Sequence, residues 1–204
     1  MKKQWTYWIL AGVLAAVPGT SAAYATEEEE AISVPLDAFE TEEGAYQFAS
    51  CAWGSPMEEV LEEFPYTMAE LLMAKDSNPE GLDYYIAEEP FALDGQPAEL
   101  RLEFHEEKLK EVRFSFELDD SYAEWYETQV QELTGLYGKP DRQTVNTLDA
   151  LGMTNWSCAW DTEETSLQFL LITREHGEAT AVLGAAEMSR ETGTSCASPA
   201  LMIR

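Results

Sequence analysis

The chain has 204 residues and carries 39 acidic against 12 basic side chains, a formal net charge of −27 at pH 7. This excess of carboxylates excludes nucleic acid and anionic lipid surfaces as partners, because both require clustered lysine and arginine. Basic proteins or peptides and divalent ions remain. A solvated acidic face that binds nothing is the simplest alternative.

The first 25 residues are typical of a secretory signal peptide. Lys2 and Lys3 precede an apolar run from Trp5 to Val17, and Ala23-Tyr24-Ala25 matches a small-x-small cleavage site. We therefore expect a secreted or extracytoplasmic protein, cleaved after Ala25, with no stable membrane anchor afterwards. A retained transmembrane anchor is the alternative. No cysteine lies at the end of the apolar run to carry a lipid.

Residues 26–44 are predicted to form an acidic disordered spacer and an irregular lead-in. Glu27 to Glu30 is a run of four glutamates, and Pro35 interrupts a stretch without periodicity. Ala45 to Trp53 is then expected to form a short strand. These segments lead into the first of two similar halves.

The first half, residues 45–120, begins its folded part with a helix. Ser55 and Glu58 have the spacing of a capping box with Pro56 at the first helical position, and Pro65 ends or kinks the helix. A second helical piece is expected from Met68 to about Ala74. Three strands should follow as a meander, over Tyr84 to Phe91, Ala98 to Phe104 and Leu109 to Leu118.

The first meander alternates clearly between two faces. The predicted inward set is apolar, whereas Arg101 and Arg113 point outward among glutamates. Asp94-Gly95 favours a tight hairpin turn, because both central positions of a type I′ turn need positive φ.

The second half, residues 121–186, repeats this plan. Ser121 and Glu124 predict a capping box for a helix that Gly138 and Pro140 end. Its predicted apolar stripe is Tyr122, Trp125, Tyr126, Val130, Leu133, Leu136 and Tyr137. Lys139 to Leu151 is expected to connect the helix to strands over Asn155 to Asp161, Ser166 to Arg174 and Glu178 to Gly184. Residues 187–204 are predicted to be a flexible tail.

The fold class expected from this pattern is α+β. Two repeats of a helix plus a three-stranded antiparallel meander would pack their helices on one sheet face. Ser55 to Ser121 is an offset of 66 residues and Asp94 to Asp161 one of 67, which favours a tandem repeat. Leu170 and Ile172 make the second face of the later meander apolar, so that face is either covered or part of a binding surface.

The residues that carry chemistry are few. His105 and His176 both fall at predicted turns, and no nucleophile elbow, phosphate loop, zinc cluster or calcium loop is present. We therefore expect no cofactor and no metal, although weak ion binding at Asp119-Asp120 or at Asp161 to Glu164 is an alternative. Cys158 is expected to be buried, a bridge to Cys51 is left open, and Cys196 is the odd thiol.

Two short stretches resemble known families. Trp53-Gly54-Ser55-Pro56-Met57-Glu58-Glu59-Val60 and Leu136-Tyr137-Gly138-Lys139-Pro140, each followed by a meander, are similar to envelope modules of the BamE/SmpA type and to tandem-repeat beta-lactamase inhibitor (BLIP-like) domains. The resemblance implies a sheet covered by helices on one face, with the other face free to bind protein.

We therefore predict an exported, non-enzymatic binding module that recognises a basic protein or peptide through a sheet face. Leu170, Ile172, Arg101 and Arg113 are the predicted partner-binding residues. The alternative is a carboxylate-based hydrolase that acts on cell-wall glycan or peptide. A folded spacer without a ligand site is a third hypothesis.

Overall fold

The computed structural model describes residues 30–39, 44–49, 51–72, 78, 81–118, 122–148, 152–174 and 179–188. The predicted signal peptide, Asp119-Asp120, Ser121, His176 and Cys196 lie outside these ranges. So does all of the predicted tail beyond Met188.

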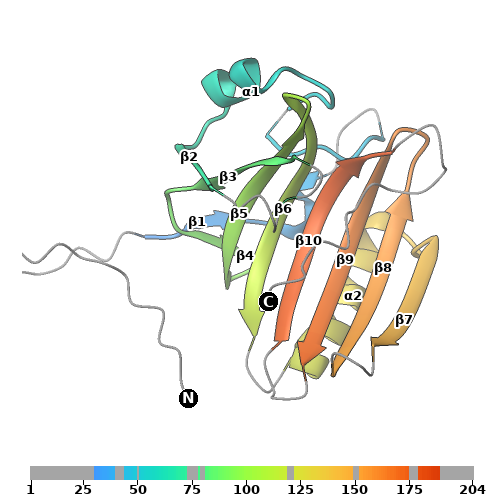
Figure 1. Ribbon diagram of the computed structural model, residues 1–204. Coiled ribbons are helices and arrows are strands. Elements are labelled where there is room, and N and C mark those ends of the chain that lie inside the picture. The colour runs from blue at the N-terminus through green and yellow to red at the C-terminus, as the bar shows by residue number, and fades with distance from the viewer. Residues whose placement is uncertain are drawn as a thin grey trace, which may run out of the picture.

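Ten strands and two α-helices make up the described fold (Figure 1). The strands are β1 (Ile32–Val34), β2 (Met68–Glu70), β3 (Asp83–Ala87), β4 (Phe91–Leu93), β5 (Gln96–His105), β6 (Lys108–Leu118), β7 (Arg142–Leu148), β8 (Met153–Asp161), β9 (Thr165–Arg174) and β10 (Ala179–Glu187). The helices are α1 (Met57–Glu63), α2 (Tyr122–Tyr137) and the short 3-10 helix η1 (Leu36–Phe39).

All ten strands belong to one sheet. Its main path runs β1-β4-β5-β6-β10-β9-β8-β7, and β3 pairs with both β2 and β5 beside this path. Only the β1–β4 pair is parallel; the other pairs of named strands are antiparallel. The long strand β5 holds β4 along its first residues and β3 along its last.

The expected fold class is wrong. Instead of two repeats of a helix on a three-stranded meander, the chain forms one large mixed sheet with two α-helices. The strands predicted for the two halves merge because β6 pairs with β10 over eight residues, from Ala179 opposite Leu118 to Ala186 opposite Glu111. A sheet edge that would be exposed in a separate repeat is thereby paired and buried.

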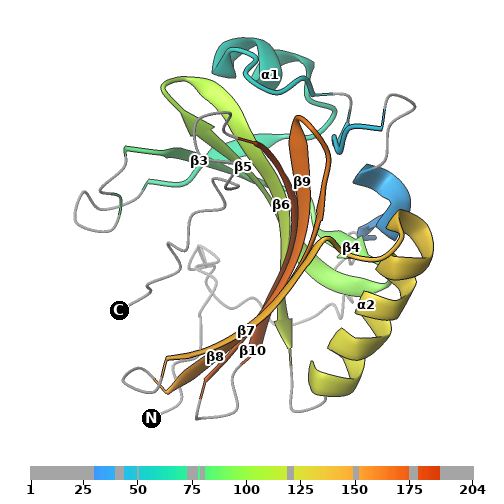
Figure 2. The same cartoon turned by 90° about the vertical axis from the view of Figure 1, so that its right-hand side faces the viewer.

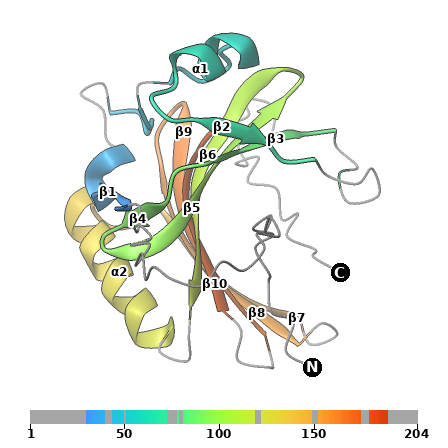
Figure 3. The same cartoon turned by 90° about the vertical axis from the view of Figure 1, so that its left-hand side faces the viewer.

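The sheet is strongly curved, and α2 lies on its convex side (Figures 2 and 3). A row of side chains on this side crosses six neighbouring strands, as the pairing registers show. The row consists of Leu100, Phe114, Leu183, Phe169, Cys158 and Gln143. Its first five members are buried and belong to the main core.

Helix α2 is held to the sheet by aromatic contacts. The Tyr126 ring stacks on Phe169 with the centroids 4.8 Å apart, and Trp125 contacts Phe116 at 5.4 Å. Leu133 is completely buried, whereas Leu136 of the predicted stripe is 44% exposed. The helix ends where predicted, because Gly138 adopts a φ of 82° that favours glycine.

The two tight turns of the first half are confirmed. Asp94 and Gly95 have φ values of 49° and 76° and join β4 to β5, as a type I′ turn requires. His105 lies at the turn between β5 and β6, and its side chain is exposed.

Several predictions for the first half are wrong. The α1 helix has Pro56 as its N-cap and no side-chain cap hydrogen bond. The Ser55 carbonyl accepts from the Leu109 N–H, which holds this part of the chain against β6. Met68 to Glu70 is strand β2, since pairing with β3 outweighs its helical periodicity. The described residues of the stretch from Ala45 to Trp53 form no strand beyond a single bridge residue at Tyr46.

The lead-in is more ordered than predicted where it is described. Strand β1 pairs with β4, and η1 follows it directly. Val34, Leu36 and Phe39 are all buried in the core. The apolar residues of this segment therefore close one end of the core beneath β4.

Candidate functional site

Strand β7 forms one end of the sheet. It pairs only with β8, in an unbroken antiparallel register from Arg142 opposite Ala159 to Leu148 opposite Met153. All seven of its residues are exposed. No described strand pairs with its outer edge, where alternate residues of an antiparallel strand direct their N–H and C=O groups away from the partner.

The outer edge of β7 carries none of the usual features that prevent pairing. Natural edge strands are commonly protected by lysines, prolines or bulges. The stretch Gln143 to Leu148 has no charged residue and no proline, in a chain that is 25% charged, and its pairing with β8 has no bulge. Val145 is 63% exposed and Leu148 44%. This edge can therefore accept a further extended strand.

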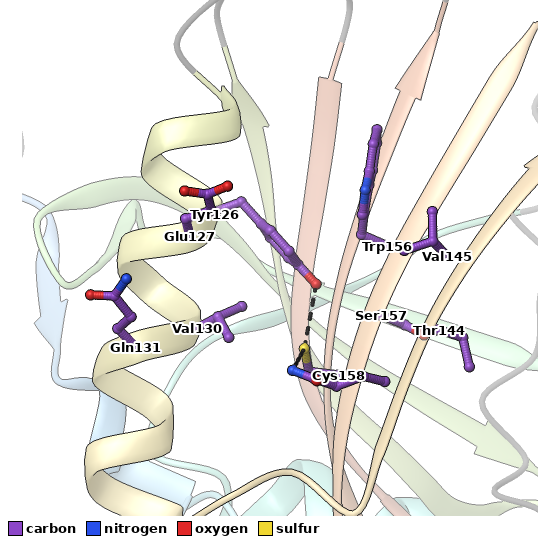
Figure 4. Close-up of a pocket in the computed structure, with 10 residues that line it drawn as sticks. Tyr126, Glu127, Val130, Gln131, Thr144, Val145, Trp156, Ser157 and Cys158 are labelled. Carbon is purple, nitrogen blue, oxygen red and sulfur yellow. Dashed lines mark hydrogen bonds between the residues drawn. The ribbon is translucent and has the colours of Figure 1, made fainter.

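A groove lies between this edge strand and α2 (Figure 4). Its volume is about 400 Å³, and we call it the helix groove. It is lined by Tyr126, Glu127, Val130, Gln131, Gln143, Thr144, Val145, Trp156, Ser157 and Cys158. The β7 edge and the helix groove together make the candidate site.

The deepest part of the groove is uncharged. The Cys158 thiol lies 3.7 Å from the Tyr126 hydroxyl, and the Gln143 amide N–H donates to its sulfur at 3.5 Å. Burial, with a smaller contribution from Cys158, raises the pKa of Tyr126 well above its ordinary value, so the phenol stays protonated. A thiol needs a nearby base or cation to become a nucleophile. No histidine, lysine or arginine lies among the described lining residues.

The rim of the groove is acidic. Glu127 and Gln131 are exposed on α2, and the helix contains three glutamates but no lysine or arginine. Arg142, the one basic residue of β7, is already neutralised: its guanidinium donates to both oxygens of Asp161, at 2.7 and 2.8 Å. The local charge offered to a bound segment is therefore negative.

No metal or membrane feature appears in the described part of the chain. Its histidines, cysteines and carboxylates form no group of three or more that could hold a metal ion. Within the same residues, no helix is long and apolar enough to cross a membrane. Cys51 and Cys158 are free thiols, and burial, with a smaller effect of Glu63, raises the pKa of Cys51 to about 11.

Arg101 and Arg113, predicted to bind a partner, lie together on the concave face. They are directly opposite each other in β5 and β6, and their guanidinium carbons lie 5.9 and 6.0 Å from the Tyr84 ring centroid. Arg113 is also 3.5 Å from Glu111, and Arg101 is 2.7 Å from Glu99. Both guanidinium groups are thus engaged with their neighbours.

This charged cluster is largely buried. The side chains of Arg113, Glu103 and Glu111 are only 11%, 6% and 10% exposed. Burial, followed by the charge of Glu103, raises the pKa of Tyr84 to about 12. The cluster contains two arginines and three glutamates, so its charges nearly balance and it offers a partner little net charge.

Leu170 and Ile172, the other two predicted residues, share the concave face with the arginines. Leu170 lies opposite Val182 of β10 and is half-buried, whereas Ile172 is only 6% exposed. Arg113 is in register with Gly184 and Gln168, and Leu170 lies two residues farther along β9 than Gln168. A role of these four residues in partner binding stays a prediction.

The sequence analysis missed the groove and its edge strand. Residues 142–148 were expected to be part of a connection, because a strand exposed on both faces shows no apolar alternation. The available signal was composition: Thr144, Val145 and Thr147 are β-branched and the segment lacks glycine and proline. Tyr126 and Val130 were predicted on the apolar stripe of the helix; Tyr126 is buried in the core and Val130 packs against it, and both also line the groove.

No protein-family model, no curated protein and no solved structure matched the chain. The resemblance to BamE/SmpA modules and to BLIP-like domains therefore stays a prediction. The functional argument has to rest on the geometry of the site.

Proposed function

We propose that this protein is a non-enzymatic binding module that takes an extended segment of a partner protein as an additional strand along β7. The observation that supports this is the regular, fully exposed and unprotected edge from Gln143 to Leu148. Strand addition uses main-chain hydrogen bonds for affinity and neighbouring grooves for specificity. The predicted signal peptide makes export part of the proposal.

A partner protein is a better occupant than a second copy of this chain. Two copies would each bring a net charge of −27 to the contact, and like charges oppose association. A basic or neutral segment meets no such barrier. The helix groove beside β7 adds apolar surface that an extended segment can cover.

A hydrolase finds less support at this site. Glycoside hydrolysis needs two carboxyl groups across the cleaved bond, one of them with a raised pKa. Glu127 is the single carboxylate among the described lining residues. Elsewhere, the pKa values of Glu89 and Asp161 are lowered, which is the opposite of what a general acid needs.

The test is a display library of linear peptides, each long enough to pair with all of β7, selected on the purified protein. Selected peptides are then measured on Thr144→Pro and Val145→Pro. Neighbouring residues of a strand direct their N–H groups to opposite sides, so one proline removes only an outward donor while the other breaks the β7–β8 ladder. The proline variant that keeps wild-type stability should lose peptide binding.

Two further measurements make the result decisive. N-methylation of a selected peptide at successive positions should weaken binding at every second position, because only alternate amides of the added strand face β7. Leu170→Glu with Ile172→Glu should leave this binding unchanged. If the stable proline variant binds as tightly as wild type, or if only the Leu170 and Ile172 variant loses binding, β7 is not the site.

A further inference from the structure

The part of α2 that lines the groove carries two parallel rows of side chains. Tyr126 and Val130 are four residues apart and form an apolar row close to the sheet. Glu127 and Gln131 have the same spacing and form a polar, exposed row farther out. Figure 4 shows Tyr126 and Val130 pointing toward the strands, whereas Gln131 points away from them. The groove therefore has an apolar floor and an acidic outer wall.

An added strand would place half of its side chains in this groove. It would lie about 4.8 Å from β7, and its residues would alternate between the two faces of the sheet. Those on the convex face lie in line with Val145 and Gln143, which share that face with Cys158 and Trp156. Consecutive side chains on this face come from residues i and i+2 of the bound segment.

We propose that the site selects an extended segment with a large apolar side chain and a lysine or arginine two residues away, both facing α2. This inference rests on the proposed strand addition at β7 and specifies its ligand. The apolar side chain covers Val145, Trp156 and Val130 within the volume of about 400 Å³. The basic side chain reaches Glu127 on the outer wall.

The charges around the groove favour a basic second side chain over an acidic one. Glu127 has no cationic neighbour on α2, because the helix contains no lysine or arginine. Arg142 is held by Asp161 and so does not neutralise the rim. An acidic residue at the same place would meet repulsion from Glu127 and from the net charge of the chain. A long basic side chain gains the opposite interaction and can extend its aliphatic part over the groove.

The probes are synthetic peptides with a threonine and serine background. The first carries tryptophan and lysine two residues apart; the second carries them at adjacent positions, which places them on opposite faces. The third and fourth are versions of the first peptide. Serine replaces the tryptophan in the third, and glutamate replaces the lysine in the fourth. We expect the first to bind about tenfold or more tighter than the peptide without tryptophan. Its advantage over the adjacent-position peptide should be about two- to fivefold.

Two protein variants form the matched pair. Glu127→Gln removes the charge of the outer wall and should weaken the tryptophan and lysine peptide about two- to fivefold. The same variant should bind the glutamate peptide more tightly than the wild type does. Glu132→Gln, also exposed on α2 but outside the groove lining, should change neither affinity. Titrations at low and high salt should show that the lysine contribution is screened.

The outcomes separate this inference from the proposed function. Equal binding of all four peptides, with alternating sensitivity to N-methylation, keeps strand addition and overturns the selection rule. Tight binding of the first peptide without any effect of N-methylation keeps the groove and overturns strand addition. Equal effects of Glu127→Gln and Glu132→Gln overturn the assignment of the basic residue to Glu127. Absence of binding by every peptide overturns both proposals.

Discussion

Gly184 of β10 lies against β6 with no room for a side chain. A Cβ atom placed on it would lie 2.7 Å from the Arg113 Cβ and 2.9 Å from the Val112 carbonyl oxygen. Because the second contact is with backbone, neither neighbour can move aside easily. Gly184→Ala should lower the free energy of unfolding by about 1–3 kcal/mol, measured by urea denaturation.

The control for this substitution is Gly135→Ala in α2. No atom lies within 4 Å of a Cβ added at Gly135, and the residue is in the interior of a helix. Alanine should therefore stabilise the protein by about 0.5–1 kcal/mol. A Gly184→Ala variant as stable as Gly135→Ala would show that the β6–β10 contact is looser than described.

Asp161, which binds Arg142 at the start of β7, makes the free energy of unfolding depend on pH. The hydrogen bonds from Arg142 lower its pKa below the unfolded value of 3.8, so the unfolded chain binds this proton first as the pH falls. The stabilisation is complete above that value and is lost as the pH falls through the folded pKa. It amounts to no more than about 1 kcal/mol, because Arg142 is largely exposed.

We expect Asp161→Asn to lower the free energy of unfolding at about pH 6. Between about pH 6 and pH 3, the free energy of unfolding of this variant should fall by less than that of the wild type. Urea denaturation at both pH values gives the comparison, which cancels the effect of the other carboxylates. Parallel pH dependence of the two proteins would mean that Arg142 and Asp161 do not form their pair in solution.

The packing of helix α2 on the sheet depends strongly on Phe169. Phe169 stacks on Tyr126 and contacts Trp125, and it is 1% exposed. Phe169→Ala should cost about 3–5 kcal/mol of unfolding free energy and loosen the helix. The adjacent Leu170→Ala, on the opposite face and half-buried, should cost no more than about 2 kcal/mol. Near-ultraviolet circular dichroism of the stacked aromatics should change only in the first variant.

The sequence predicted those elements whose signal is local. Strict alternation located β5 and β6 from Leu100 and Phe114, and the periodic stripe with Gly138 located α2. Short strands such as β2 were missed, because three residues around Ala69 carry too little periodicity to compete with a helical interpretation. The junction of β6 with β10 was missed for another reason: Phe114 and Leu183 are far apart in the chain, and neither residue alone encodes the other as its partner.

The candidate site was harder to predict than the fold. Cys158 was correctly expected to be buried, and Tyr126 and Val130 were correctly placed on the apolar side of α2. The groove exists because α2 does not cover β7, where Val145 remains 63% exposed. Whether a helix covers the last strand of a sheet depends on the strand order, which local patterns do not contain.

The single sheet and the net charge act together at the level of the whole molecule. A continuous ten-stranded sheet leaves few edges, and in the described structure β7 is a long one without protection. Such an edge favours pairing with another copy, in the manner of edge-to-edge aggregation. The charge of −27 opposes this pairing over a distance set by the ionic strength. The acidic surface therefore performs the role that lysines or prolines perform on other edge strands.

Self-association should consequently depend on salt. The Debye length falls from about 30 Å at 0.01 M to about 3 Å at 1 M, so high salt removes most of the repulsion between copies. We expect sedimentation velocity to show a monomer at low salt and concentration-dependent association at high salt. Thr144→Lys, which places a charge on β7 itself, should remain monomeric in both. Association of this variant to the same extent as the wild type would mean that copies meet through another surface and that charge protects something other than β7.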